Sequence, residues 1–303
     1  EALETEIDDD LKAATQGWLE NIKDAEGSKR FGDQIREMLL GYAGDPLLDK
    51  IDGLAAHFTK RSYWIFVGDG SAYDISFGGI DHVMASGENI NMMVYDTEVY
   101  SNTGGQSSKA TPTGSVAKFA ASGKKTAKKD LGAMMMSYGY VYVASVAMGA
   151  NKQQMLKAIT EAEAYDGPSI IIAYCHCIAH GFDLKAGCDH QKMAVEAGLW
   201  PLYRSDPALA AKGEPPLQLD AGGEIKRPVK DFTMTETRFR MVQKLYPERF
   251  DRLQAVRSRH RPPDLACRAS FGSTAHPPGG RSESCRAVLF PGDNEVGRNV
   301  LGQ

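Results

Sequence analysis

An aspartate held between two glycines, directly after an apolar run, is the first place where this sequence could do chemistry. The segment "FVGDGSAYD" places Asp69 between Gly68 and Gly70, after the apolar residues 62–67. Glycines allow a tight turn and let a ligand approach the backbone closely. An acid at this point would repel a bare phosphate, whereas Mg²⁺ binds carboxylates and bridges them to phosphates. The segment by itself is compatible with an ordinary turn or with a metal-bridged diphosphate.

A second polar segment supplies oxygen donors at the end of another apolar run. Residues 90–96, "INMMVYD", are followed by "TEVYSNTGGQSS", which offers the Thr97 hydroxyl and the Asn102 amide. It also supplies hydroxyl groups and exposed backbone N–H groups, which are suited to binding oxyanions. Taken together with Asp69, the segment favours a bound metal and diphosphate over a turn. No Gly-Lys-Ser/Thr follows the glycines of the first segment, which excludes a P-loop, and the spacing is not that of a dinucleotide fingerprint.

Four short apolar runs, separated by helical patterns, must position these residues. The runs span residues 62–67, 90–96, 141–147 and 168–175. Strands that are apolar throughout and alternate with helices predict parallel βαβ units with helices on both faces. Such sheets bind ligands at the carboxyl ends of their strands, where "GDGS", "DTEVYSNTGGQ" and "CHCIAH" begin. We therefore predict an α/β fold, doubly wound with a mostly parallel sheet, whose rim gathers these three segments.

The chain is expected to divide into three regions. Residues 1–205 should form the α/β domain, with a helical lead-in over residues 1–50. Residues 206–256 are predicted to form an extended C-terminal arm and one helix, the helix spanning 233–254. Residues 257–303 are rich in Arg, Pro and Gly and have no hydrophobic period. They are expected to be a disordered tail or the product of a shifted reading frame, and we favour the second because the composition breaks sharply.

Composition and charge exclude several classes of protein. The net charge is −4 and no apolar run reaches the length of a membrane helix, so neither nucleic acid nor a membrane is an expected partner. Five cysteines in 303 residues are no disulfide framework, which favours a reducing compartment, the cytoplasm or a reducing organelle. The chain begins at Glu1 rather than Met. We therefore expect it to be a fragment or a processed chain.

The run from Gly68 through "YDTEVYSNTGGQSSKATP" resembles the thiamine-diphosphate domain of the pyruvate:ferredoxin (flavodoxin) oxidoreductases. The resemblance covers about residues 10–250 and is most specific over its last part. It implies bound thiamine diphosphate and Mg²⁺, with Asp69, the Thr97 side chain and the Val99 carbonyl as metal ligands. Asn102 would reach toward the reacting carbon as a catalytic residue. Other residues would line or border the cofactor: Gly68, Gly70, Ser71, Glu98, Tyr100 and Ser101.

The same resemblance implies an activity and a set of partners. The family carries out CoA-dependent oxidative decarboxylation of pyruvate to acetyl-CoA and CO₂, and iron–sulfur clusters pass the electrons to ferredoxin or flavodoxin. It implies further domains upstream of Glu1 and a homodimer. A chain that lacks those domains would be inactive alone, because a partner domain supplies the glutamate that activates the cofactor. The alternative is a non-redox thiamine-diphosphate decarboxylase or synthase of 2-oxo acids.

The cysteines of "YCHCIAHG" allow three interpretations. Cys175, Cys177 and His180 could form part of a zinc site in a binding module without a cofactor. The two cysteines could also be plain buried thiols. The resemblance matches Cys177 to the fourth ligand of a [4Fe-4S] cluster, whose other three ligands would lie before residue 1. Cys175 stands where the family has another residue type, and we assign it no ligand role.

A group of lysines in "SGKKTAKKD" could attract an acidic protein. These residues are Lys124, Lys125, Lys128 and Lys129. They could steer a ferredoxin to its docking site, but the solvated start of a helix is the favoured interpretation. His180 and His190 are expected near the rim of the sheet, with no role predicted for either.

Overall fold

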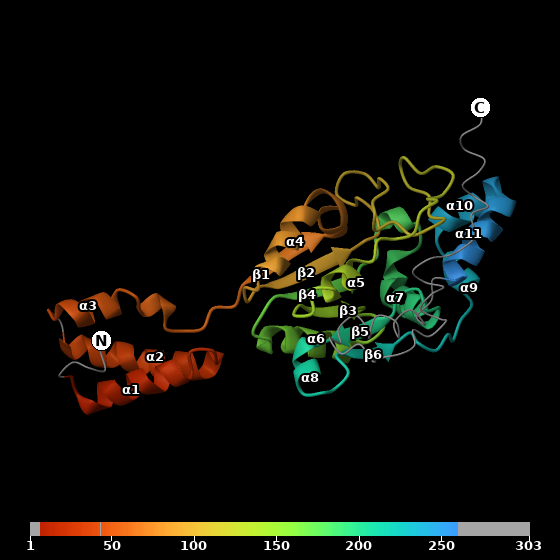
Figure 1. The fold of residues 1–303 in the computed structure, drawn as a ribbon. Helices are drawn as coiled ribbons and strands as arrows, with labels where there is room; N and C mark the ends of the chain where they lie inside the picture. Colours follow the sequence, from red (N-terminus) through yellow and green to blue (C-terminus); the bar gives the residue numbers. More distant parts are fainter. Residues whose placement is uncertain (1–6, 43, 260–303) are drawn as a thin grey trace. The chain divides into compact units, whose positions relative to one another are not determined.

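The chain consists of two compact units, residues 1–63 and residues 64–303. The structure is a computed structural model that describes residues 7–42 and 44–259. The first unit is helical, and the second is built around a six-stranded sheet (Figure 1). Within the described residues, no helix is both long and apolar enough to cross a membrane.

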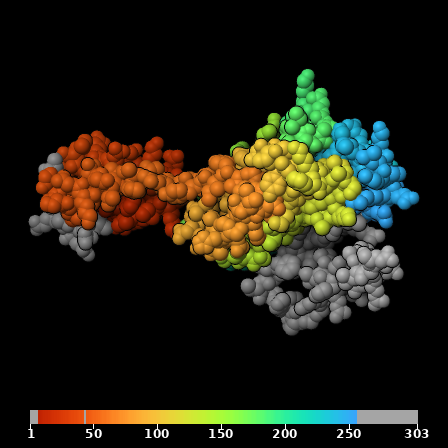
Figure 2. Space-filling view, turned by 90° about the horizontal axis from the view of Figure 1, so that it is seen from above, coloured from red at the N-terminus to blue at the C-terminus, as the bar shows by residue number. Residues whose placement is uncertain are grey.

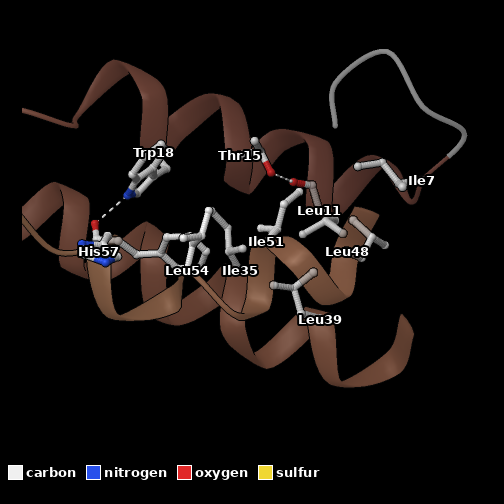
Figure 3. A pocket seen from close by; sticks show the side chains of 11 residues that line it. Ile7, Leu11, Thr15, Trp18, Ile35, Leu39, Leu48, Ile51, Leu54 and His57 are labelled. Atoms are coloured by element: carbon white, nitrogen blue, oxygen red, sulfur yellow. Dashed lines mark hydrogen bonds between the residues drawn. The ribbon is translucent and has the colours of Figure 1, made fainter. Parts of the chain in front are cut away.

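In the described residues of the first unit, 7–42 and 44–63, the chain forms three helices and two short 3₁₀ turns. The helices are α1 (Asp9–Glu20), α2 (Ala25–Leu39) and α3 (Pro46–Asp52). An aspartate caps each of them, because the side chains of Asp8, Asp24 and Asp45 accept hydrogen bonds from first-turn N–H groups. Apolar side chains from all three helices line a cavity of about 470 Å³ (Figure 3). The buried core of the unit consists of Leu11, Ala14, Ile35, Leu39, Leu48 and Phe58.

The six strands of the second unit are arranged in the order β1-β2-β4-β3-β5-β6. They are β1 (Trp64–Gly68), β2 (Asn91–Asp96), β3 (Tyr142–Val146), β4 (Ser169–Tyr174), β5 (Leu202–Ser205) and β6 (Leu217–Ala221). The first four are parallel and overlap the four predicted runs, with ends that differ by one or two residues. The last two are antiparallel to their neighbours. The predicted α/β class with a mostly parallel sheet is therefore confirmed.

Helices cover both faces of the sheet, as a doubly wound fold requires. One face packs against α4 (Phe77–Ala85), α5 (Leu131–Met136) and α7 (Gly187–Glu196), and the other against α6 (Lys152–Ala164). Neighbouring residues of one strand point to opposite faces. In β2, Val94 belongs to the first core and Met93 to the second. The side chain of Asn151 caps α6 by accepting from the N–H of Gln154 at 3.0 Å.

The C-terminal region adds a strand and several helices to the same unit. After β5 come α8 (Pro207–Ala211), β6, α9 (Val229–Thr233), α10 (Thr237–Leu245) and α11 (Pro247–Arg259). The prediction of one continuous helix over residues 233–254 is wrong. Pro247 lacks an N–H group and starts a new helix instead of continuing the previous one. Beyond Arg259, the predicted atypical tail lies outside the described residues.

The carboxyl ends of β1, β2 and β4 lie side by side, because these strands are parallel neighbours. All three predicted polar segments therefore leave the sheet at one edge. The long segment 97–130 continues from β2 and reaches α10, where the N–H of Val116 donates to the Arg238 carbonyl at 2.9 Å. Figure 2 shows this segment, in yellow, on the surface beside the blue C-terminal helices.

Candidate metal and cofactor site

Asp69 and Thr97, which follow two neighbouring strands, are in direct contact. The Thr97 hydroxyl lies 2.8 Å from Asp69 Oδ1 and 3.1 Å from the Val99 carbonyl oxygen. The backbone N–H of Thr97 also donates to Asp69 Oδ1, at 3.3 Å. Two of the predicted ligand oxygens, from Asp69 and Val99, therefore lie next to the third, the Thr97 hydroxyl. Their role as metal ligands stays a prediction.

The second carboxylate oxygen of Asp69 provides a test of whether a cation fits here. Asp69 is only 2% exposed, and its Oδ2 has no hydrogen-bond partner within the described part of the chain. Burial, together with the nearby Asp96, raises the pKa of Asp69 to about 7. A buried carboxylate needs a compensating charge. Neighbouring ligands of octahedral Mg²⁺, at about 2.05 Å from the ion, lie about 2.9 Å apart, so the observed oxygen separations fit this metal.

Glu98 turns the backbone between two of these oxygens. Its φ angle is 62°, in the left-handed region that residues other than glycine seldom adopt. The N–H of Glu98 donates to Asp96 Oδ1 at 3.0 Å, and its carbonyl accepts from the Thr111 hydroxyl at 2.6 Å. The turn brings the Val99 carbonyl back toward the Thr97 hydroxyl. Backbone strain of this kind is concentrated at functional sites.

Lys128 is half-buried and pairs with the fully buried Asp96, next to Asp69. Its Nζ is 2.6 Å from Asp96 Oδ2 and 3.4 Å from Glu98 Oε1. The Tyr73 hydroxyl donates to the same Asp96 oxygen at 2.7 Å. The predicted solvated helix start is therefore wrong for Lys128, since the sheet edge and the segment after β2 enclose it. The helix itself begins only at Leu131.

Residues at the start of α10 reach the same site from the far end of the chain. Arg238 Nη2 lies 2.6 Å from Glu98 Oε2, and Arg238 Nε lies 2.7 Å from Glu236 Oε2. Glu236 Oε1 is in turn 2.8 Å from His190 Nε2. His180 Nε2 lies 2.7 Å from the Thr97 carbonyl oxygen. Arg238 thus joins α10 to the Glu98 side chain, and His180 contacts the backbone of Thr97.

Four residues of this site were missed by the sequence analysis: Asp96, Lys128, Glu236 and Arg238. A signal for Asp96 was present, because it ends an apolar run much as Asp69 follows one. No local signal could have found Arg238, whose contact with Glu98 joins residues 140 positions apart.

The other predicted cofactor residues are close neighbours of Asp69 or Thr97 in the sequence. Gly70 is packed so tightly that an added Cβ would lie 2.5 Å from the ring of Tyr100. Ser71 belongs to the wide π-helical turn Gly70–Ile75 that leads to α4. Ser101 and Asn102 lie in an exposed turn after Tyr100. The roles of all these residues toward a cofactor stay predictions.

The cysteines do not form the zinc site that one interpretation required. No three His, Cys, Asp or Glu side chains of residues 7–42 and 44–259 form a group that could hold a metal ion. His180 instead contacts the Thr97 carbonyl. Burial raises the pKa of the Cys175 thiol to about 12. Cys177 is buried after β4 and accepts from the Ala179 N–H at 3.5 Å, and its role as a cluster ligand stays a prediction.

Comparison with known proteins first defines a class. Residues 52–173 match the family described as "Thiamine pyrophosphate enzyme, C-terminal TPP binding domain". This match includes the contact of Asp69 with Thr97 and all four parallel strands, the last almost to its end. The sheet unit is therefore a thiamine-diphosphate-binding domain of this class.

The helical unit and the curated relatives then identify the family. Residues 1–48 match "Pyruvate-ferredoxin oxidoreductase, insertion domain". The chain is 54% identical to pyruvate:ferredoxin oxidoreductase of Moorella thermoacetica and 51% identical to pyruvate-flavodoxin oxidoreductase of Klebsiella pneumoniae. These matches cover 84% and 83% of this chain but only 22% of each relative. The chain belongs to the pyruvate:ferredoxin oxidoreductase family and spans about a fifth of the length of these relatives.

Proposed function

We propose that this chain forms the thiamine-diphosphate- and Mg²⁺-binding part of a pyruvate:ferredoxin or pyruvate:flavodoxin oxidoreductase. Such an enzyme converts pyruvate and coenzyme A into acetyl-CoA and CO₂. The observation that carries the proposal is the 2.8 Å contact between Asp69 and Thr97, next to a buried Asp69 oxygen that has no hydrogen-bond partner among the residues the structure describes. The names of the relatives support the choice of substrate and electron acceptor. The activity belongs to a longer protein that contains this chain.

The proposed roles follow from where each group lies. The Asp69 carboxylate, the Thr97 hydroxyl and the Val99 carbonyl would hold Mg²⁺, and through it the diphosphate. Thiamine diphosphate, when bound, supplies the electron sink that decarboxylation of a 2-oxo acid requires. The backbone around Gly68, Gly70 and Ser71 would line the diphosphate. The Asn102 amide, in its exposed turn, would donate a hydrogen bond to the 2-oxo acid and orient its carbonyl.

Cys177 is the proposed fourth ligand of a [4Fe-4S] cluster. It follows β4, whose neighbour β2 leads into Thr97, so the thiolate would lie at the same sheet edge as the metal site. A cluster needs four thiolates, and we propose that the other three come from outside this chain. Electrons would leave through ferredoxin or flavodoxin. A homodimer in the cytoplasm is the proposed setting.

Metal titration tests the cofactor site directly. Mn²⁺, a paramagnetic substitute for Mg²⁺, is titrated into the protein at a fixed concentration of thiamine diphosphate, and free Mn²⁺ is measured by electron paramagnetic resonance. The Asp69→Asn substitution is expected to weaken Mn²⁺ binding at least about tenfold. The exposed Asp189 provides a matched control, Asp189→Asn, with unchanged affinity. Equal affinities of wild type and Asp69→Asn would falsify the proposed metal site.

Iron analysis separates the redox enzyme from the non-redox alternative. Iron and acid-labile sulfide are measured in the longer protein that contains this chain, as wild type, Cys177→Ser and Cys188→Ser. We expect Cys177→Ser to lose about one cluster's content, and the exposed Cys188→Ser to lose none. A wild-type protein without iron would instead favour a decarboxylase or synthase.

A further inference from the structure

We propose that Arg238 is a positioning residue for the metal site and that it acts through Glu98. In this view the ion pair between the two side chains holds Glu98 in its left-handed conformation. That conformation in turn keeps the Val99 carbonyl beside the Thr97 hydroxyl. The inference rests on the proposed function, because it assigns a role toward the metal that Asp69, Thr97 and Val99 would hold.

Both the backbone and the side chain of Glu98 make contacts that hold it in place. Its N–H and carbonyl are bonded to Asp96 and Thr111. Its carboxylate is bonded to Arg238 at 2.6 Å and lies 3.4 Å from Lys128. A glutamate with a φ angle of 62° is under strain that the surroundings must oppose. The Arg238 guanidinium lies closer to the Glu98 carboxylate than the Lys128 ammonium does.

Arg238 is itself held rigidly enough to act as an anchor. Its side chain is 1% exposed, and Glu236 accepts from its Nε at 2.7 Å. The Arg238 carbonyl also accepts from the N–H of Val116, which fixes the backbone at the start of α10. An anchored guanidinium presents its donors in a fixed plane, so it constrains the direction of the Glu98 carboxylate. A flexible surface cation could not do this.

Glu98 variants of equal charge separate backbone conformation from electrostatics. Glu98→Ala and Glu98→Gly both remove the carboxylate and leave Arg238 paired with Glu236. Alanine meets the left-handed penalty without the ion pair, whereas glycine adopts this conformation freely. We expect Glu98→Ala to raise the dissociation constant of Mn²⁺, with thiamine diphosphate present, about tenfold. Glu98→Gly should raise it by at least about threefold less than Glu98→Ala does, because glycine keeps this conformation without the ion pair.

The role of Arg238 is tested by its dependence on Glu98. Arg238→Lys keeps the charge but loses the planar fork, and it is expected to weaken Mn²⁺ binding by about fivefold. In a Glu98→Gly background, the same substitution should have no further effect, because the backbone no longer needs the ion pair. Arg240→Lys, at an exposed position of the same helix, is the matched control. Thermal unfolding of each metal-free variant identifies any that fail to fold.

The outcomes distinguish this inference from the proposed function. If Mn²⁺ binding by the wild type does not depend on Asp69, the metal site itself is wrong. If binding depends on Asp69 but Glu98→Ala binds like wild type, only the positioning role fails. Equal losses in Glu98→Ala and Glu98→Gly would overturn it as well, because the charge and not the conformation would then matter. Additive effects of Arg238→Lys and Glu98→Gly would likewise exclude action through Glu98.

Discussion

At the scale of single residues, the site combines groups that are unfavourable by themselves. Asp69 is buried, and one of its oxygens has no hydrogen-bond partner in the described part of the chain, while Glu98 adopts a backbone conformation that suits glycine. Each is a cost to folding that a protein keeps where function requires it. Substituting either residue should therefore affect metal binding and the stability of the metal-free protein differently.

The first prediction concerns the stability of the metal-free protein. Asp69→Asn removes a buried charge while keeping the shape of the side chain, so it should stabilise the metal-free fold at about pH 8, where the carboxylate is largely ionised. A gain of about 1 kcal/mol corresponds to a rise of about 2–4 °C in melting temperature. Calorimetry in the presence of a chelator measures this rise. A lower melting temperature than wild type would show that the carboxylate is satisfied in the metal-free protein.

The second prediction uses the two glycines on either side of Asp69. A Cβ on Gly70 would lie 2.5 Å from the Tyr100 ring, whereas a Cβ on Gly68 would meet no atom within 4 Å. Gly70→Ala should therefore destabilise the protein by about 1–3 kcal/mol, and Gly68→Ala by no more than about 0.5 kcal/mol. Urea unfolding measures both changes. Tyr100→Ala should restore part of the loss in Gly70→Ala, and equal losses in the two glycine variants would contradict the packing.

At the scale of elements, half-buried lysines hold the segment between β2 and α5 together. Lys124 illustrates this, because its Nζ donates to the Thr111 carbonyl at 2.6 Å and to the Lys109 carbonyl at 3.3 Å. Backbone carbonyls satisfy the ammonium group and at the same time hold the segment closed. Burial, and the nearby Lys128, lower the pKa of Lys124 to about 8.

The third prediction follows from this lowered pKa. An unfolded lysine titrates near pH 10.4, so between about pH 8 and 10.4 the unfolded chain binds more protons than the folded one. The contribution of Lys124 to the free energy of unfolding therefore rises with pH in this window. Urea midpoints at about pH 7.5 and 10 are compared for wild type, Lys124→Met and the exposed control Lys125→Met. We expect wild type and the control to share a rise that Lys124→Met lacks, and the same pH dependence in all three proteins would refute the assignment.

At the scale of the whole molecule, the two units have separate hydrophobic cores. Among the described residues, the buried core of the helical unit is formed by residues 11–58, and the two cores on the faces of the sheet are formed by residues 72–232. The family comparison also divides the sequence in two, with an insertion-domain match over residues 1–48 and a cofactor-domain match that begins at residue 52, before the structural boundary at residues 63 and 64. A substitution in the core of one unit should therefore destabilise that unit.

The fourth prediction tests this separation. Leu11 is 2% exposed and lines the cavity of the helical unit, so Leu11→Ala should destabilise that unit by about 2–5 kcal/mol. Leu19, on the same helix but 46% exposed, provides the control Leu19→Ala. Hydrogen exchange should increase across residues 7–63 in Leu11→Ala and stay unchanged in β1 to β4. Faster exchange in the strands as well would mean that the two cores are coupled.

The sequence by itself determined the parallel core of the sheet and the pair of residues at its edge. The four apolar runs are local patterns, and their length and composition were enough to predict β1 to β4. Asp69 and Thr97 each follow such a run. The carboxyl ends of parallel strands share one edge, so their meeting could be inferred before any coordinates were known.

Only the tertiary structure decided the strand order, the antiparallel strands β5 and β6, and the surroundings of the site. Lys128 looked like a solvated charge, because its partners Asp96 and Glu98 lie about thirty residues away in sequence. Arg238 could not be found at all, since neither its residue type nor its neighbours on α10 indicate a contact with Glu98. Local patterns reflect which face of an element is buried. Which distant element supplies the partner of a buried charge depends on how the elements pack. A single sequence contains no periodic pattern that reveals this packing.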